Sequence, residues 1–130
     1  MKVKYLSDDY FNELEQRAGK EEERPGANIG AQYVITDPPE AGDIRYYLKI
    51  EDGRIVQARR GALDEPSFTV TMSYDSSVRL QEGELHPATG FATGELQVSG
   101  DKASLLTMIP VFQSSAYQAL IGDLRTMSEY

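Results

Sequence analysis

The sequence contains no cysteine, which excludes disulfides, a thiolate nucleophile and cysteine metal ligands. Its single histidine, His86, has no other residues spaced to join it in the set of converging ligands that a metal site needs. The N-terminal stretch lacks the apolar core of a signal peptide, and no apolar run approaches the length of a membrane span. We therefore expect a cytoplasmic protein with no integral membrane segment, no metal and no other cofactor.

Basic residues are also few. The chain has 13 Lys and Arg residues and 21 Asp and Glu residues, which gives a formal net charge of −8. A nucleic-acid-binding protein needs a basic surface to neutralise phosphates, so this balance disfavours nucleic acid as a partner. The same charge gives no electrostatic attraction to an anionic membrane surface. Its simplest role is to keep the protein soluble.

The length and composition are those of one folded domain, which we expect to span residues 1–130. Apolar residues make up 40% of the chain and charged residues 26%, a balance that argues against disorder. No internal repeat or low-complexity linker divides the sequence. A chain of this size can bury one substantial core.

The first half of the chain predicts a helix followed by strands. Ser7 is placed to cap the helix, whose apolar residues recur at helical spacing. Residues 29–36 are predicted to form a strand. Residues 44–51 alternate between apolar and polar side chains, with Tyr46 and Leu48 on the same apolar side. This second strand is therefore expected to have one buried face.

Asp52 and Gly53 predict a hairpin turn at the end of that strand, because glycine accepts a positive φ without strain. Two registers are open. A two-residue loop sets Gln57 opposite Leu48, and a three-residue loop with Gly53 in a bulge sets Val56 there instead. We favour the second register because Val56 would continue the apolar face.

The second half of the chain alternates strands with short helices. Residues 68–74 form the clearest half-buried strand, and Asp75 is placed to cap a short helix after it. A His-Pro step at His86 begins another brief helix. Gly94 is expected to open a further strand, which Gly100 ends.

Two helices complete the chain. Asp101 is expected to cap the first, which Pro110 breaks or kinks, and Ser114 is expected to cap the second. The order is a helix, about four strands interrupted by short helices, one more strand, and then helices. This order predicts an α+β fold with an antiparallel or mixed sheet whose one face is covered.

No combination of residues is typical of a catalytic site. The sequence has neither a glycine-rich phosphate loop nor a Gly-x-Ser-x-Gly elbow. A structural role for His86 is a simpler interpretation than catalysis. Capping and turn chemistry explain the acidic residues at turns and helix starts, which are Asp37, Asp52, Asp64, Glu65, Asp75 and Asp101. The second half of the chain is rich in aromatic and flexible apolar residues. Pattern alone assigns these residues to a hydrophobic core in preference to a ligand pocket.

The segment from Asp64 to Asp101, DEPSFTVTMSYDSSVRLQEGELHPATGFATGELQVSGD, resembles the sterol carrier protein 2 family. Members have a strand of alternating Thr, an acidic residue opening a short helix, a Gly-x-Leu-x-Pro segment, an aromatic residue near Gly, and a strand ending in Gly-Asp or Gly-Asn. The matching residues here are Phe68–Tyr74, Asp75, Gly83–Pro87, Phe91 with Gly94, and Leu96–Asp101. The upstream YYLKIEDGRIVQARRG also resembles the family's second and third strands, so the resemblance covers roughly residues 30–112.

The resemblance implies a five-stranded, mostly antiparallel sheet that helices cover on one face, with an apolar tunnel between them. It also implies non-catalytic binding of a lipid such as a fatty acid, fatty acyl-CoA, sterol or phospholipid, and leaves open whether the protein also transfers that lipid. The family's domain also occurs fused to enzymes, where it assists packing or dimerisation. The expected partner is therefore an apolar small molecule, and the chain is expected not to be an enzyme.

We expect this tunnel to be lined by side chains of the second half, with the last helix acting as a lid. Arg59 or Arg60 is a candidate contact for an anionic head group at the mouth. The expected lining residues are Phe68, Val70, Met72, Val78, Leu80, Phe91, Leu96, Val98, Leu105, Met108, Ile109, Phe112, Leu120 and Leu124.

Two alternatives to lipid binding stay open at this point. The same apolar face can be filled by the protein's own helices or by a partner chain, which would make the domain a ligand-free interaction or homodimerisation module. A weaker alternative is an enzyme that acts on acyl groups, using His86 or a turn carboxylate. The contents of the space between the last helices and the sheet decide among these readings.

Overall fold

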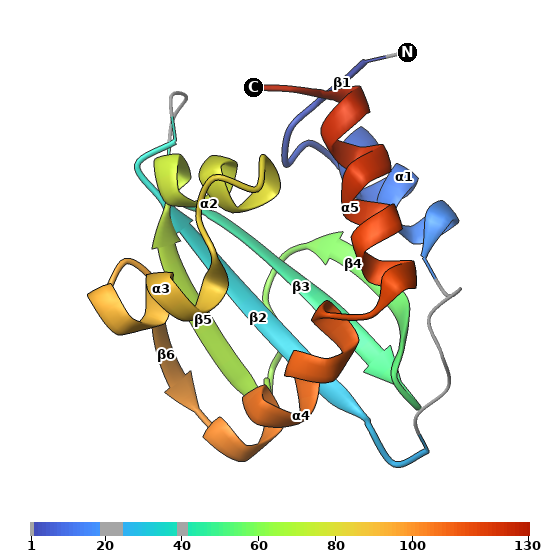
Figure 1. Cartoon of the computed structure of the whole chain (residues 1–130), viewed down its shortest axis with the longest axis vertical. Helices are drawn as coiled ribbons and strands as arrows, with labels where there is room; N and C mark the ends of the chain where they lie inside the picture. Colours follow the sequence, from blue (N-terminus) through green and yellow to red (C-terminus); the bar gives the residue numbers. More distant parts are fainter. Residues whose placement is uncertain (1, 19–24, 39–41) are drawn as a thin grey trace.

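The computed structural model describes residues 2–18, 25–38 and 42–130. A five-stranded sheet forms the centre of the molecule, and the helices lie over one of its faces (Figure 1). In chain order the elements are β1 (Val3–Lys4), α1 (Asp8–Arg17), β2 (Ile29–Thr36), β3 (Ile44–Glu51), β4 (Arg54–Arg60), β5 (Phe68–Ser73), α2 (Tyr74–Gln81), α3 (Pro87–Thr93), β6 (Gln97–Gly100), α4 (Lys102–Phe112), α5 (Ser115–Met127) and β7 (Ser128–Glu129).

The strand order of the sheet is β4-β3-β2-β5-β6. Neighbouring strands are antiparallel, except that β2 and β5 run parallel. The predicted α+β class with a mostly antiparallel five-stranded sheet is therefore confirmed. In β3 the side chains of Leu48 and Ile50 are buried while Lys49 and Glu51 are exposed. This alternation matches a sheet that is covered on one face.

The hairpin register that we favoured from the sequence is wrong. The turn has two residues, since Glu51 pairs with Arg54, but the pairing then shifts so that Leu48 faces Ala58. The unpaired residue is Val56, and its side chain is 51% exposed. The bulge turns both Ile55 and Ala58 toward the core, which strict alternation does not allow.

The helix starts follow the predicted caps at most positions. Ser7 and Ser114 cap α1 and α5 as predicted, each accepting a backbone N–H with its side chain. The Asp75 cap is wrong, because the Ser73 hydroxyl accepts the Ser76 N–H at 3.1 Å and β5 ends one residue earlier than predicted. The helix α4 continues through Pro110, so proline does not break it there.

The strand predicted from Gly94 begins later than expected. Gly94 has a φ of 84° and ends α3, so β6 starts only at Gln97. The other end of β6 is at Gly100, as predicted, where φ is 101°. A Cβ at Gly100 would lie 2.9 Å from the Phe68 Cα, so glycine is also required there by the closeness of β5.

The two ends of the chain pair with each other, which the sequence analysis did not foresee. β1 and β7 form a two-stranded parallel sheet, with Val3 beside Ser128 and Lys4 beside Glu129. The Tyr5 N–H donates to the Glu129 carbonyl at 2.9 Å. This pairing holds the end of α5 next to the start of α1, at the top of the view in Figure 1.

A buried apolar core runs between the sheet and the helices. Phe68 and Ile35 from the sheet and Met108 and Leu124 from the helices are almost completely buried there. Among the described residues, no helix is both long enough and apolar enough to cross a bilayer.

Candidate functional site

A cavity of about 350 Å³ lies between the covered face of the sheet and the helices. Its floor is formed by inward-facing side chains of three neighbouring strands, namely Tyr33, Tyr46, Leu48, Val70 and Met72. The volume falls within the range of small-molecule sites, which is about 300–1,000 Å³. The cavity is therefore the leading candidate for a ligand-binding site in the described part of the chain.

Each of the helices α1 to α5 contributes to the walls of this cavity. The spacing on α5 shows how: Tyr117, Ile121 and Arg125 stand four residues apart and share one stripe of the helix, which faces the cavity. The remaining helical side chains in the wall are Tyr10, Phe11 and Leu14 of α1, Ser77, Leu80 and Gln81 of α2, Pro87, Ala88 and Phe91 of α3, Leu105 and Ile109 of α4, and Gln118 of α5.

The structure brings half of the expected lining residues together at the cavity. These seven are Val70, Met72, Leu80, Phe91, Leu96, Leu105 and Ile109. Phe68, Met108, Leu120 and Leu124 are instead buried in the core, and Val78 and Val98 pack half-buried against that core. The side chain of Phe112 lies outside the described residues.

The wall also contains residues that the sequence analysis did not assign to the site. Four of them come from the first 14 residues, and two are tyrosines of the sheet; they are Tyr5, Tyr10, Phe11, Leu14, Tyr33 and Tyr46. A signal existed for Tyr46, which alternates in phase with Leu48. None existed for Tyr5, because its position depends on pairing between the two ends of the chain.

The tyrosine hydroxyls are among the polar groups of a mostly apolar wall, together with the side chains of Ser77, Gln81 and Gln118. The Tyr5 hydroxyl donates to the Ser77 carbonyl and the Tyr10 hydroxyl to Gln81 Oε1, both at 3.2 Å. The rings of Tyr33 and Tyr46 stack, with 4.8 Å between centroids and 10° between planes. Burial raises the pKa of each of these four phenols above its ordinary value, so all four are neutral at physiological pH.

The cavity reaches the surface between α5 and the segment from α2 to α3. Exposed Gly83 and His86 stand on one rim, and exposed Gln118 and Arg125 stand on the other. Among the described lining residues, Arg125 is the one with a full charge. Neither Arg59 nor Arg60 lines this cavity.

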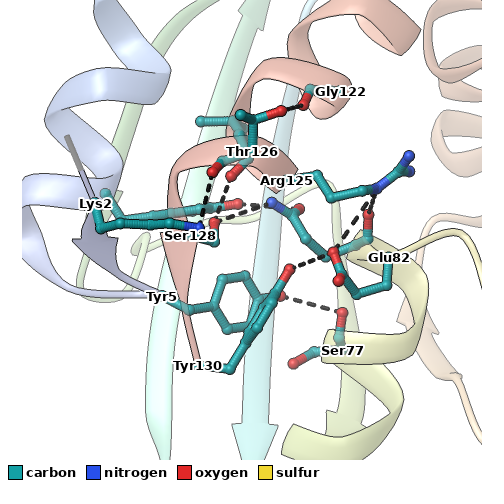
Figure 2. Close-up of polar contacts among 12 residues, drawn as sticks. Lys2, Tyr5, Ser77, Glu82, Gly122, Arg125, Thr126, Ser128 and Tyr130 are labelled. Atoms are coloured by element: carbon teal, nitrogen blue, oxygen red, sulfur yellow. Dashed lines mark hydrogen bonds and ion pairs between the residues drawn. The ribbon is translucent and has the colours of Figure 1, made fainter.

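A group of polar contacts joins the end of α5 to the end of α2 beside this mouth (Figure 2). Arg125 Nε donates to the Gln81 carbonyl at 2.9 Å and lies 3.8 Å from Glu82 Oε2. The Tyr130 hydroxyl donates to the same Glu82 oxygen at 2.8 Å, and its ring contacts that of Tyr5 with 5.0 Å between centroids. These contacts join side chains from both ends of the chain beside the mouth of the cavity.

A second hollow, of about 540 Å³, lies near the opposite face of the sheet. Its wall includes Tyr47 and Lys49 of β3 and Asp64 and Glu65 of the following loop. The buried Gln32 side chain holds this loop, donating to the Gly61 carbonyl and accepting from the Leu63 N–H. The charged, open surroundings make this hollow a poorer candidate than the apolar cavity.

Comparisons with known proteins identify relatives at the level of family and fold. A family model described as the SCP-2 sterol transfer family matches residues 11–113. Among curated proteins, none matches the sequence significantly.

The solved structures that are similar share the fold at low sequence identity. A sterol carrier protein 2 has a TM-score of 0.71 and 17% identity, covering 95% of this chain and 99% of that one. A palmitated sterol carrier protein 2 like 2 from Aedes aegypti has a TM-score of 0.63 and 14% identity, covering 88% and 96%. A stereoselective inverting sec-alkylsulfatase from Pseudomonas sp. has a TM-score of 0.56 and 16% identity, covering 95% of this chain and 16% of the enzyme.

Proposed function

Because the chain belongs to the SCP-2 sterol transfer family, we propose that it binds a single-chain lipid in the cavity between the sheet and the helices, without changing it chemically. The observation that carries this proposal is the cavity itself. A space of about 350 Å³ stays unfilled where the side chains of the sheet and of five helices meet. A ligand-free interaction module would use the same face for side-chain packing, so the unfilled space favours the binding function.

The size of the cavity favours a slender ligand. A methylene group occupies about as much space as a water molecule, whose share of liquid volume is about 30 Å³. The cavity, at about 350 Å³, therefore accommodates an unbranched chain of about ten to twelve carbons. A four-ring sterol would need the helices to move apart. We therefore expect an alkyl or acyl chain to bind better than a sterol.

The energetics of such a ligand are sufficient for specific binding. Burial of one methylene contributes about 0.8 kcal/mol, so ten contribute about 8 kcal/mol before the cost of association. The wall carries the aromatic and flexible side chains that suit this role, including Phe91 and Met72. The palmitated relative from Aedes aegypti supports the idea that this fold can hold a fatty chain.

The arrangement of polar groups supports binding without catalysis. His86 Nδ1 accepts the Ala88 N–H at 3.1 Å, so the imidazole serves as the cap of α3. Among the described lining residues there is no carboxylate that can act as a base. In the described ranges, no cluster of His, Asp and Glu side chains is able to hold a metal ion. We therefore expect turnover of acyl substrates to be absent.

The proposal is tested by placing a larger side chain on α5 that fills the cavity. Ile121 points into the cavity, whereas Ala119 of the same helix is exposed and not part of the wall. We expect Ile121→Trp to abolish displacement of a fluorescent fatty acid and to remove co-purified lipid from native mass spectra. Ala119→Trp is the matched control and should bind as the unaltered protein does. An unaltered protein that neither retains lipid nor binds the probe would overturn the proposal.

A further inference from the structure

Tyr33 and Tyr46, which are partly buried, differ from the buried Tyr5 and Tyr10 in the state of their hydroxyl groups. The hydroxyls of Tyr5 and Tyr10 donate to Ser77 and Gln81. Within the described residues, no side chain or backbone group forms a hydrogen bond with the hydroxyl of Tyr33 or Tyr46. Both side chains line the cavity, so these hydroxyls are available to a polar group that enters it.

The geometry places the two tyrosine rings side by side. Tyr33 and Tyr46 are directly opposite each other in the β2–β3 ladder, and their rings are stacked almost parallel. Both side chains therefore project from the sheet in the same direction, into the cavity. The hydroxyls do not hydrogen-bond to each other in the described structure. One hydroxyl oxygen lying near both phenols can accept a hydrogen bond from one of them and donate a hydrogen bond to the other.

The electrostatics of this place favour an oxygen that carries no charge. Burial keeps both phenols protonated, with the pKa of Tyr33 and of Tyr46 raised. Arg125, the charged group among the described lining residues, is at the mouth and is engaged with Gln81 and Glu82. A carboxylate buried beside the tyrosines would have no cation to compensate it, and burial of an unpaired ion is costly.

We propose that the stacked pair Tyr33 and Tyr46 is a binding site for an uncharged oxygen, such as the hydroxyl of an alkyl alcohol, of the ligand held in the cavity. This inference rests on the proposed function and deepens it by naming the polar group of the ligand. The alkyl chain extends from the tyrosine pair along the apolar wall formed by Val70, Leu96 and Phe91. A charged head group, by contrast, stays at the mouth beside Arg125.

The test compares two volatile ligands that differ in one oxygen, 1-octanol and octane, by their partition between vapour and protein solution. The Tyr33→Phe/Tyr46→Phe double variant keeps both rings and removes both hydroxyls. We expect it to lower the affinity for 1-octanol about tenfold and to leave the affinity for octane unchanged. The matched control is Tyr47→Phe, because Tyr47 is on β3 but faces the opposite side of the sheet.

The two proposals fail in different ways in this experiment. The double variant could bind 1-octanol and octane with the same affinities as the unaltered protein. The tyrosine pair would then not be an oxygen site, and this inference would be overturned while the proposed function stands. If the unaltered protein binds neither compound, the proposed function is overturned together with the inference. A loss of octane binding in the double variant would show that the rings have moved, which also contradicts the inference.

Discussion

The carboxylate of Glu15 accepts a hydrogen bond from the backbone N–H of Ala58 at 2.7 Å. Ala58 belongs to β4, one of the two edge strands of the five-stranded sheet, whose outer N–H groups have no neighbouring strand. The same oxygen also accepts from Arg59 Nε at 3.1 Å. A helix side chain thereby occupies part of an edge that would otherwise be available for pairing with another chain.

Replacement of Glu15 tests the contribution of this contact. We expect Glu15→Ala to lower the free energy of unfolding by about 1.5–3 kcal/mol, because a charge-assisted hydrogen bond is lost and the N–H of the buried Ala58 is left without its acceptor. Glu13→Ala is the control, since Glu13 pairs with Arg17 within the helix and should cost about 0.5 kcal/mol. Urea denaturation measures both. Equal losses in the two variants would contradict the assignment.

The two kinds of buried tyrosine predict opposite effects of removing a hydroxyl. Tyr10→Phe breaks the hydrogen bond to Gln81 and should lower the free energy of unfolding of the lipid-free protein by about 1–2 kcal/mol. Tyr33→Phe removes a hydroxyl without a partner and should raise it by up to about 1 kcal/mol. Thermal or urea unfolding distinguishes them. A loss for Tyr33→Phe as large as that for Tyr10→Phe would show that its hydroxyl is paired.

Alkaline titration should reveal the buried phenols. Burial raises the pKa of Tyr5, Tyr10, Tyr33 and Tyr46, whereas a tyrosine of the unfolded chain ionises near a pH of about 10. The folded state keeps these protons where the unfolded state releases them. Their contribution to stability is therefore full below about pH 10 and falls as the pH rises further.

The measurement is phenolate absorbance followed together with circular dichroism. We expect exposed tyrosines to ionise gradually and the buried ones to ionise in one step that coincides with unfolding. Gradual ionisation of all eight tyrosines of the chain in a protein that stays folded would contradict the burial of these groups.

The bulge in β4 is tested by two neighbouring residues. Val56 is 51% exposed and Ile55 only 4% exposed. We expect Val56→Lys to change the free energy of unfolding by no more than about 0.5 kcal/mol. Ile55→Lys should unfold the protein or cost more than about 3 kcal/mol, because it buries a charge. The register favoured from the sequence has Val56 facing the core, and it would make Val56→Lys the more destabilising of the two variants.

The bulge also shows why the strands could be predicted but their register could not. The bounds of β2 and β3 follow from alternation, which is a local property of residues 29–36 and 44–51. The shift at Val56 instead accompanies a contact with α1, whose Glu15 accepts the Ala58 N–H from a distant part of the sequence. Pattern alone cannot reveal a side chain that arrives from another element.

The cavity lining was partly predictable for a similar reason. The apolar stripe of α5 is evident from the sequence, but it consists of two adjacent rows of side chains that face different surroundings. Leu120 and Leu124 face the core, while Tyr117 and Ile121 face the cavity. Which row meets the cavity depends on how α5 packs against α1 and on the pairing of β1 with β7, and both are contacts between the two ends of the chain.

The parallel pairing of β1 with β7 has a mechanical consequence. Tension applied through Val3 and Glu129 would pull two parallel strands past each other, so their hydrogen bonds would be loaded in shear and would yield together. We expect the ring contact between Tyr5 and Tyr130 to be lost when that short sheet separates. Stretching is then expected to draw Tyr5 out of the cavity wall while the five central strands are still joined.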